Sequence, residues 1–432
     1  MVKRQNLKWL LLFPFPLLAI SCHKNDDNHV TMQEHTLTVQ NILQANSLVE
    51  SGTFQGQGSP PFIMPGQSVS FRFSAAPGQT VTFAAMYGFS NDLFFAPENP
   101  GIALYDKSNQ PLAGDVSSQI RLWDNGTRIN QPPGSSVNHP GTAESKAIQE
   151  VNGTDAQNNH YLPASDLVKA TLVYEGASYF TLTLKNISGG TSNETPLSPG
   201  VWAVSYIAGG KPLNSNPLYQ KNHTSANGLT PLTEMGDNSQ LYSYVKDNTG
   251  IFTPLSPVLV VVYNGIENPI FMTGMKDAGQ GLKDLAQKGD ASGLAASLKK
   301  MQGVKAVYVL PDPANTVLLP AIENQPGGMV SQKLEVAKGD KLAIATMYGF
   351  SNDWFFATKK NGIDATQTGD VSDSIGLFDD GTAVSQFPGA GNMQFNLGGT
   401  PGPESNPIQE VPDPNTFNTL PQIKDMIKVV LQ

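Results

Sequence analysis

The sequence predicts a mainly β protein that consists of tandem antiparallel β-sandwich domains with a few short helices. Apolar and polar residues alternate in short runs such as 69–73 and 80–83, and Pro-Gly pairs separate these runs. The chain has 41 glycines and 32 prolines but only 15% charged residues, a composition typical of proteins with many turns. One segment also occurs twice, which indicates a duplicated domain.

The repeated segment is Met-Tyr-Gly-Phe-Ser-Asn-Asp, at 86–92 and again at 347–353. An aromatic pair and an alanine follow each copy. Three further pairs of segments recur downstream in the same order: 114–117 with 369–372, 123–127 with 378–382, and 148–151 with 408–411. The acids inside this repeat are therefore the first candidates for function.

The first 22 residues are typical of an export signal, with a basic start, an apolar stretch at 9–20 and a final cysteine. Residues 18–22 resemble the lipobox of bacterial lipoproteins, so we expect Cys22 to carry lipid; an ordinary secretory signal is the alternative. The polar tether at 23–33 resembles the export tag of surface lipoproteins. This favours an outer-membrane anchor that faces outward over one that faces the periplasm.

Cysteine count and charge exclude several classes of function. Cys22 is the only cysteine, so the exported chain has no disulfides, catalytic thiol or cysteine zinc site. Removing the signal takes away three of the 27 basic residues and none of the 36 acidic ones. An acidic chain without basic runs is a poor binder of nucleic acid.

The familiar catalytic motifs are also missing from the sequence. It contains no Gly-x-Ser-x-Gly elbow, no His-Glu-x-x-His, no phosphate-binding loop and no dinucleotide fingerprint. Its six histidines lie in polar surroundings without a helical partner three or four residues away. We therefore predict that the protein is not an enzyme. A carboxylate pair in a cleft, as in glycosidases, is the alternative.

Domain boundaries follow from the repeat. We predict a first domain at 34–176, a second domain at 251–432, and a partial repeat at 177–250 that matches the front half of the second domain. In both front halves a Leu-Ser-Pro strand precedes a helical pair, at 229–245 and at 278–301. The first domain lacks this part, so we expect segment 177–250 to pack onto it and complete its sandwich.

The loop acids allow two interpretations. Asp92 and Asp353 each leave a strand, whereas Asp124 and Asp379 precede a Gly-Thr pair. In such turns aspartate often bonds its own backbone, which is the simpler interpretation. Alternatively, two loops bring their carboxylates together around calcium, which accepts six to eight oxygen ligands.

These loop acids, together with the aromatic pairs, the Leu-Ser-Pro strand and the helical pair, resemble the spondin N-terminal domain of F-spondin and mindin. The resemblance covers nearly the whole mature chain. It implies an antiparallel β-sandwich, a divalent cation in the end loops and a role in adhesion or recognition.

In the second domain the resemblance implies three metal ligands, Glu335, Asp353 and Asp379. The further acid expected after Gly-Thr is Ala383 here, and Asp380 is the candidate to replace it. We therefore predict calcium, or another divalent cation, in the second domain.

In the first domain Asp92 and Asp124 remain as the corresponding acids, but Arg72 and Arg128 stand at the other two positions. A guanidinium group can neutralise carboxylates directly. We therefore predict that internal salt bridges replace the metal there.

The aromatic pairs also allow two interpretations. Phe94-Phe95 and 354–356 could stack on sugars, but consecutive aromatic residues at strand ends more often pack in the core, and we favour core packing.

The predicted function is a lipid-anchored, non-catalytic recognition or adhesion protein whose partner is an extracellular protein or glycan. The alternative is a carbohydrate-binding accessory lipoprotein of a glycan-uptake system. Loops at 132–145 and 388–403 are the candidates for ligand contact.

Overall fold

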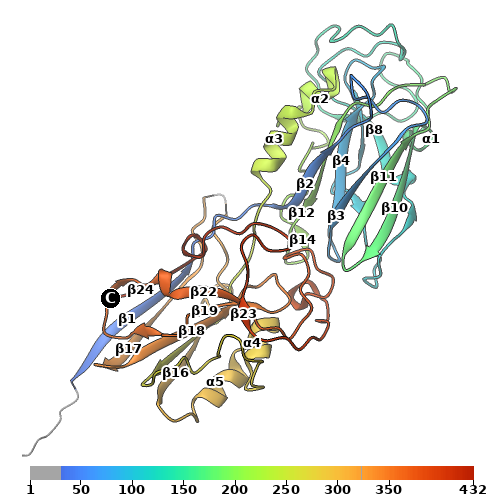
Figure 1. Ribbon diagram of the computed structural model, residues 1–432. Helices are drawn as coiled ribbons and strands as arrows, with labels where there is room; N and C mark the ends of the chain where they lie inside the picture. Colours follow the sequence, from blue (N-terminus) through green and yellow to red (C-terminus); the bar gives the residue numbers. More distant parts are fainter. Residues whose placement is uncertain (1–30, 323) are drawn as a thin grey trace, which may run out of the picture.

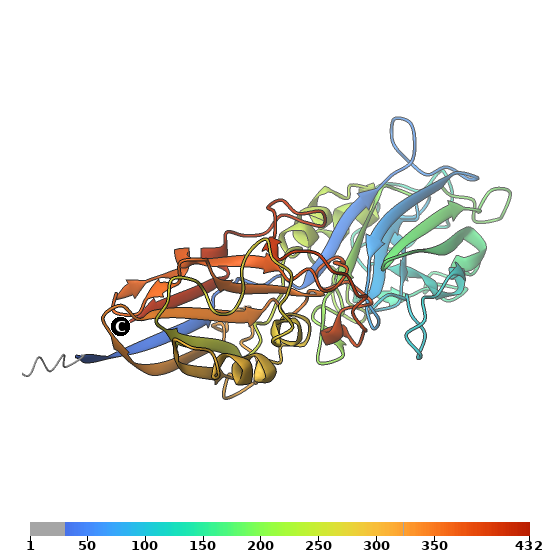
Figure 2. The same cartoon turned by 60° about the horizontal axis from the view of Figure 1, so that its bottom comes forward.

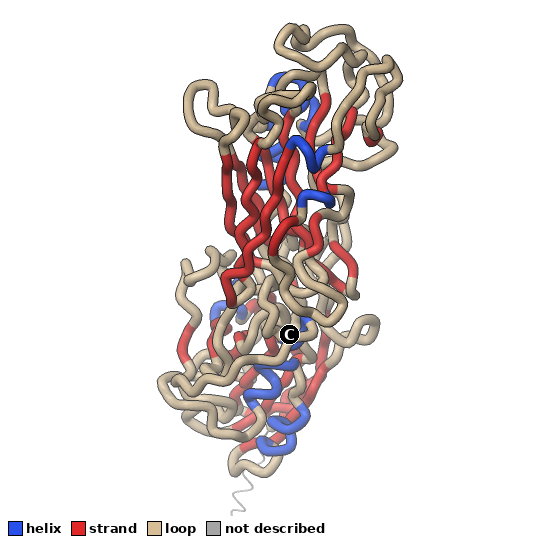
Figure 3. Tube along the Cα trace, turned by 90° about the vertical axis from the view of Figure 1, so that its right-hand side faces the viewer, coloured by secondary structure: helices blue, strands red, loops and turns tan. Residues whose placement is uncertain are grey.

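The computed structural model describes residues 31–322 and 324–432, which form two β-sandwiches stacked end to end (Figures 1 and 3). The fold is mainly β, with antiparallel sheets and short helices, as the sequence predicts. Among these residues no helix combines the length and the hydropathy that crossing a bilayer requires. The predicted signal and Cys22 lie outside the described residues.

The first sandwich consists of a seven-stranded and a four-stranded sheet. The larger sheet has the order β2 (Leu48–Phe54), β12 (Gly200–Ser205), β4 (Thr80–Met86), β5 (Leu93–Pro97), β8 (Ile120–Asp124) and β9 (Gln149–Glu150), with β6 (Ile102–Ala103) on β4. The smaller sheet has the order β3 (Ser68–Ser74), β11 (Tyr179–Asn186), β10 (Val168–Gly176) and β7 (Gly114–Asp115). Side chains such as Phe73, Phe83 and Leu182 fill the space between the sheets.

Two helices, α2 (Leu229–Met235) and α3 (Ser239–Asp247), cover the outer face of the larger sheet. Leu232 and Leu241 pack there with Trp123. Smaller elements are η1 (Ser117–Gln119), α1 (Ala164–Leu167) and the hairpin of β13 (Ile207–Ala208) and β14 (Lys211–Pro212). Segment 177–250 thus supplies β11, β12 and both helices to the first sandwich.

The second sandwich has the same three layers. Its larger sheet has the order β16 (Val304–Leu310), β15 (Val258–Tyr263), β18 (Lys341–Met347), β19 (Trp354–Thr358), β22 (Ile375–Asp379) and β23 (Gln409–Glu410), with β20 (Ile363–Asp364) on β18. The smaller sheet has the order β17 (Met329–Ala337), β1 (Met32–Asn41), β24 (Ile427–Leu431) and β21 (Gly369–Asp370). Helices α4 (Leu282–Lys288) and α5 (Ser292–Leu298) cover the outer face, and η2 (Ser372–Ser374), η3 (Phe395–Leu397) and η4 (Ile423–Asp425) are short turns.

The N-terminal strand does not belong to the first sandwich, contrary to the prediction that this unit begins at residue 34. Strand β1 pairs with β17 from Met32–Ala337 to Gln40–Met329, and also with β24. Leu37 and Val39 are buried in the second core, and Figure 2 shows β1 in blue among the orange and red strands. An alternating pattern identifies a strand but does not name its partner.

The first sandwich is therefore inserted into the second, between β1 and β15. The strands of the two main sheets correspond one to one, but in permuted order, because β11 takes the place of β1 and β12 that of β15. The entry and exit of the insert are adjacent, since the amide of Leu48 donates to the carbonyl of Asn248 at 3.0 Å.

The two sandwiches share a packed interface. The Tyr206 ring of the first lies against Phe252 and Phe350 of the second, with ring centroids 5.8 and 6.4 Å away. Gln79 Nε2 donates to the carbonyl of Gly389 at 2.9 Å. Much of loop 388–403, which we predicted to contact a ligand, is used here between the sandwiches.

Candidate functional site

Both copies of the seven-residue motif join equivalent strands, β4 to β5 and β18 to β19. Asp92 Oδ2 accepts hydrogen bonds from the amide and hydroxyl of Thr127, at 2.7 and 3.0 Å, and from the amide of Arg128 at 2.8 Å. Asp353 Oδ2 accepts the same three bonds from Thr382 and Ala383, at 2.7, 3.1 and 2.8 Å. Each motif aspartate therefore holds the loop that follows the Gly-Thr pair.

Other motif residues support the same loops. The Oδ1 atoms of Asn91 and Asn352 accept from the amides of Gln131 and Gln386, both at 3.0 Å. At Gly88 an added Cβ would lie 2.7 Å from the carbonyl oxygen of Pro196, closer than real contacts allow. Gly349 meets Pro254 in the same way. Folding requirements therefore explain much of the identity between the two copies.

The aspartates before Gly-Thr make the turn bonds of the simpler interpretation. Asp124 Oδ1 and Asp379 Oδ1 each accept from the amide two residues later, at 2.8 Å. The second oxygen differs, because Asp124 Oδ2 accepts from Asn130 Nδ2 at 2.8 Å and Asp379 Oδ2 accepts from Trp354 Nε1 at 3.1 Å.

Burial and mutual repulsion change the acidity of these groups. Burial, together with the charge of Asp124, raises the pKa of Asp92 to about 7, although the hydrogen bonds from the loop amides lower it in part. Burial and repulsion from Asp379 and Asp380 raise the pKa of Asp353 to about 8. Burial, with repulsion from Asp277, raises the pKa of Asp380 to about 7. Each carboxylate set favours uptake of a proton or a cation.

In the second sandwich the hydroxyl of Thr382 lies between two carboxylates, those of Asp353 and Asp380. It lies 3.1 Å from Asp353 Oδ2 and 2.9 Å from Asp380 Oδ2, yet it has only one proton to donate. In the first sandwich Asn125, the counterpart of Asp380, offers its Nδ2 to Thr127 Oγ1 at 3.3 Å. A protonated Asp380 would reproduce that donor.

The predicted metal ligands are only partly brought together. Asp353, Asp379 and Asp380 lie close to one another, and Asp353 Oδ1 and Asp380 Oδ1 are buried without a hydrogen-bond partner. Glu335 is elsewhere: it is exposed on β17, opposite Glu34 in the four-stranded sheet. In the described part of the chain, no three His, Cys, Asp or Glu side chains are placed to hold a metal ion.

The predicted salt bridges of the first domain have different partners. Arg72 Nε binds Glu175 Oε2 at 2.7 Å, and Arg128 binds Glu234 Oε2 at 2.8 Å. Neither guanidinium bridges the aspartate pair, so that prediction was wrong about the partners.

The prediction also aligned Arg72 with Glu335, which is two residues away from the alignment that the strand register gives. Equivalent turn bonds, from the amide of Ala76 to Gln79 and from the amide of Ala337 to Asp340, align β3 with β17. In this register Arg72 corresponds to Lys333, and Glu335 corresponds to Ser74.

The aromatic pairs are core residues, as favoured from the sequence. Phe94, Phe95, Phe355 and Phe356 are fully buried or nearly so, and Trp354 is 3% exposed. They do not form a platform for sugars.

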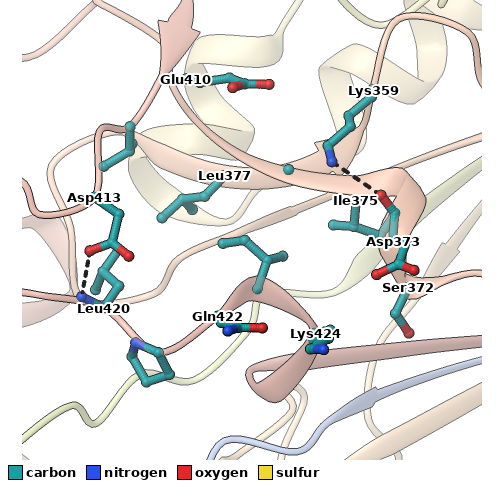
Figure 4. A pocket seen from close by; sticks show the side chains of 14 residues that line it. Lys359, Ser372, Asp373, Ile375, Leu377, Glu410, Asp413, Leu420, Gln422 and Lys424 are labelled. Carbon is teal, nitrogen blue, oxygen red and sulfur yellow. Dashed lines mark hydrogen bonds between the residues drawn. The ribbon is translucent and has the colours of Figure 1, made fainter.

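A cavity of about 380 Å³ lies between β22 and residues 410–424, and Figure 4 shows its lining. Lys359 Nζ donates to the carbonyl of Asp373 at 3.1 Å, and Asp413 accepts from the amide of Leu420 at 3.1 Å. None of the predicted ligands lines it, and no sequence motif marked it.

No model of a known protein family matches the chain, and no curated protein matches it.

Proposed function

We propose that the protein is a non-catalytic recognition or adhesion lipoprotein, anchored through Cys22 in a bacterial outer membrane and facing outward, with sandwiches related to the spondin N-terminal domain. The supporting observation is that the N-terminal strand and the free loops of the first sandwich lie at opposite poles of the molecule. Strand β1 begins at the pole remote from the first sandwich (Figure 1). The first sandwich holds its free loops at the opposite pole, where they suit contact with a partner.

Orientation-controlled coupling tests this proposal. Beads that carry residues 23–432 through the N-terminus should retain cell-surface protein or glycan. Beads coupled through Ser136→Cys, in a loop of the first sandwich, should retain much less. Equal retention by the two kinds of bead, or none by either, would contradict the proposal.

The anchor has its own test. Labelled palmitate should enter the protein in bacterial cells, and Cys22→Ser should abolish the label. External protease should digest the wild-type protein on intact cells. Label in the Cys22→Ser variant would contradict lipidation of Cys22, and resistance to protease would contradict outward orientation.

We also propose that a divalent cation, with calcium the first candidate, binds at Asp353, Asp379 and Asp380 in competition with protons. These three side chains must move closer together on binding, because the arrangement described here does not place them to hold an ion. Two buried oxygens without partners and the raised pKa values of Asp353 and Asp380 support this proposal. Glu335 takes no part.

Calorimetry at pH 8 should detect calcium binding that Asp380→Asn weakens at least tenfold. This variant reproduces Asn125 of the first sandwich and removes a carboxylate whose pKa is raised to about 7, so without calcium at pH 8 its melting temperature should be no lower than that of the wild type. The absence of binding heat in the wild type, or equal affinity in the variant, would contradict the site.

The glycan-uptake alternative depended on exposed aromatic residues in the repeat. Because these residues are buried, no observation favours it over protein recognition.

A further inference from the structure

Each sandwich has an end face that carries its copy of the seven-residue motif, and these two end faces have different surroundings. In the second sandwich this face lies beneath the first sandwich, where Phe350 is only 7% exposed and stacks on Tyr206. A Cβ added at Gly389 would lie 2.2 Å from the Tyr206 ring. The face therefore accepts an aromatic side chain from a neighbouring domain.

The same backbone contact identifies the corresponding face of the first sandwich. The amide of Gly389 donates to the carbonyl of Phe350 at 2.8 Å, and the amide of Gly134 donates to that of Phe89 at 3.1 Å. Phe89 is half-buried, and a Cβ at Gly134 would meet nothing within 4 Å. This face is uncovered, at the end of the molecule away from the second sandwich (Figures 1 and 3).

A cavity of about 340 Å³ opens beside Phe89, and its lining is mainly apolar. Phe62, Met86, Leu197 and Met235 contribute to it, and Met235 is 61% exposed. Methionine side chains are flexible and polarisable, and they adapt well to aromatic rings.

The corresponding cavity of the second sandwich, about 350 Å³, has Lys288 and Val317 in its lining where the first has Met235 and Phe62. Met235 and Lys288 are equivalent, because each ends a helix before a left-handed glycine. Phe62 and Val317 are equivalent, because the next residue of each bridges to Leu197 or Leu255. The cavity at the exposed end of the molecule thus carries Phe62 and Met235 where the second sandwich carries Val317 and Lys288.

The charged group at this cavity is already neutralised. Glu234 is 6% exposed and forms its ion pair with Arg128 at 2.8 Å. The lining therefore does not require a charged ligand. The cavity is small, at the lower end of the range for ligand sites, which suits a single ring.

We propose that this cavity and Phe89 bind an aromatic side chain presented by a protein partner, as Phe350 and Gly389 bind Tyr206 within the chain. The inference rests on the proposed recognition function and names the contact site and the chemistry of the partner. Apolar burial of a ring in a small pocket is a common anchor of protein interfaces.

Methyl NMR on the mature chain, labelled at methionine methyl groups, tests the pocket with N-acetyl-tyrosinamide as the probe. The methyl signals of Met86 and Met235 should shift saturably. Those of Met272 and Met329, which are exposed to a similar degree as Met235 but lie elsewhere, should not. No saturable shift, or equal shifts at all exposed methionines, would overturn the proposal.

Met235→Lys places the residue of the second sandwich in the first, and Met329→Lys is the matched control. At the Met86 signal, Met235→Lys should weaken probe binding at least tenfold, whereas the control should bind like the wild type. Unchanged binding in Met235→Lys would overturn the proposal.

The probe needs neither anchor nor partner, so its result is independent of the bead experiment. If the probe fails to bind while the beads retain a partner, only this inference is rejected.

Discussion

At the scale of single residues, the identity of the two motif copies reflects matched backbone contacts. Asp92 and Asp353 each accept three hydrogen bonds from the loop after Gly-Thr, and Gly88 and Gly349 each admit a close carbonyl. A buried amide left without its acceptor is costly. Selection for folding therefore preserves the motif in both sandwiches, whatever each one binds.

Asp92→Ala should lower the free energy of unfolding by about 3 kcal/mol, because it leaves the amides of Thr127 and Arg128 without acceptors. Denaturant unfolding measures the loss. Asp373→Ala, at an exposed acid, is the control and should change stability by no more than about 0.5 kcal/mol. Equal effects of the two changes would contradict a stabilising role for the hydrogen bonds that Asp92 accepts.

Glu50 should make the stability depend on pH. Burial raises the pKa of Glu50 to about 7 in the folded protein, with partial offset from Ser74 and Arg72. Its protonated form is thus favoured by folding. This contribution is complete below about pH 4.5, the pKa of an unfolded glutamate, and is lost as pH rises through 7.

Between pH 4.5 and 8.5 the wild type should therefore lose up to roughly 3 kcal/mol more stability than Glu50→Gln. Urea unfolding across this range measures both proteins. Parallel pH profiles would show that Glu50 is not the group responsible.

At the scale of elements, local signals placed the helices well. The helical pairs expected at 229–245 and 278–301 are α2, α3, α4 and α5. Asp290, two residues before the start of α5, accepts from the amide of Ser292 at 2.9 Å, although the N-cap residue itself is Ala291. Periodicity and caps are local properties, so the sequence contains them.

Two glycines should respond in opposite directions to substitution by alanine. Gly293 lies within α5 with no atom closer than 4.0 Å to an added Cβ, so Gly293→Ala should stabilise the protein by roughly 0.5–1 kcal/mol. Gly88→Ala should destabilise it, because its Cβ would strike the Pro196 carbonyl. Thermal melting compares the two, and a shift of the same sign in both would contradict this packing.

At the scale of the whole molecule, the insertion of one sandwich into the other predicts which fragment folds. Residues 46–250 contain both sheets and both helices of the first sandwich. This fragment should unfold in one cooperative transition by circular dichroism. Fragment 34–176, with the boundaries predicted from sequence, lacks β11 and β12 and should not fold. The reverse outcome would contradict the strand pairing.

For the carboxylate cluster, the sequence predicted three of the four acids that were expected to come together. Asp353, Asp379 and Asp380 come together because the loops that carry them follow paired strands. Glu335 does not join them, because it lies on β17 in the four-stranded sheet, paired with Glu34. The sequence comparison aligned Glu335 with Arg72, whereas the strand register aligns it with Ser74, and a shift of two residues moves a side chain by about 7 Å.

The sequence by itself determined the fold class, the duplication and the short helices, because alternation, turns and caps are encoded over a few residues. Only the tertiary structure decided that β1 belongs to the second sandwich, that loop 388–403 packs against Tyr206, and that the cavity beside Phe89 is exposed. These features depend on contacts between residues far apart in the chain, and a strand pattern does not specify which distant edge it joins.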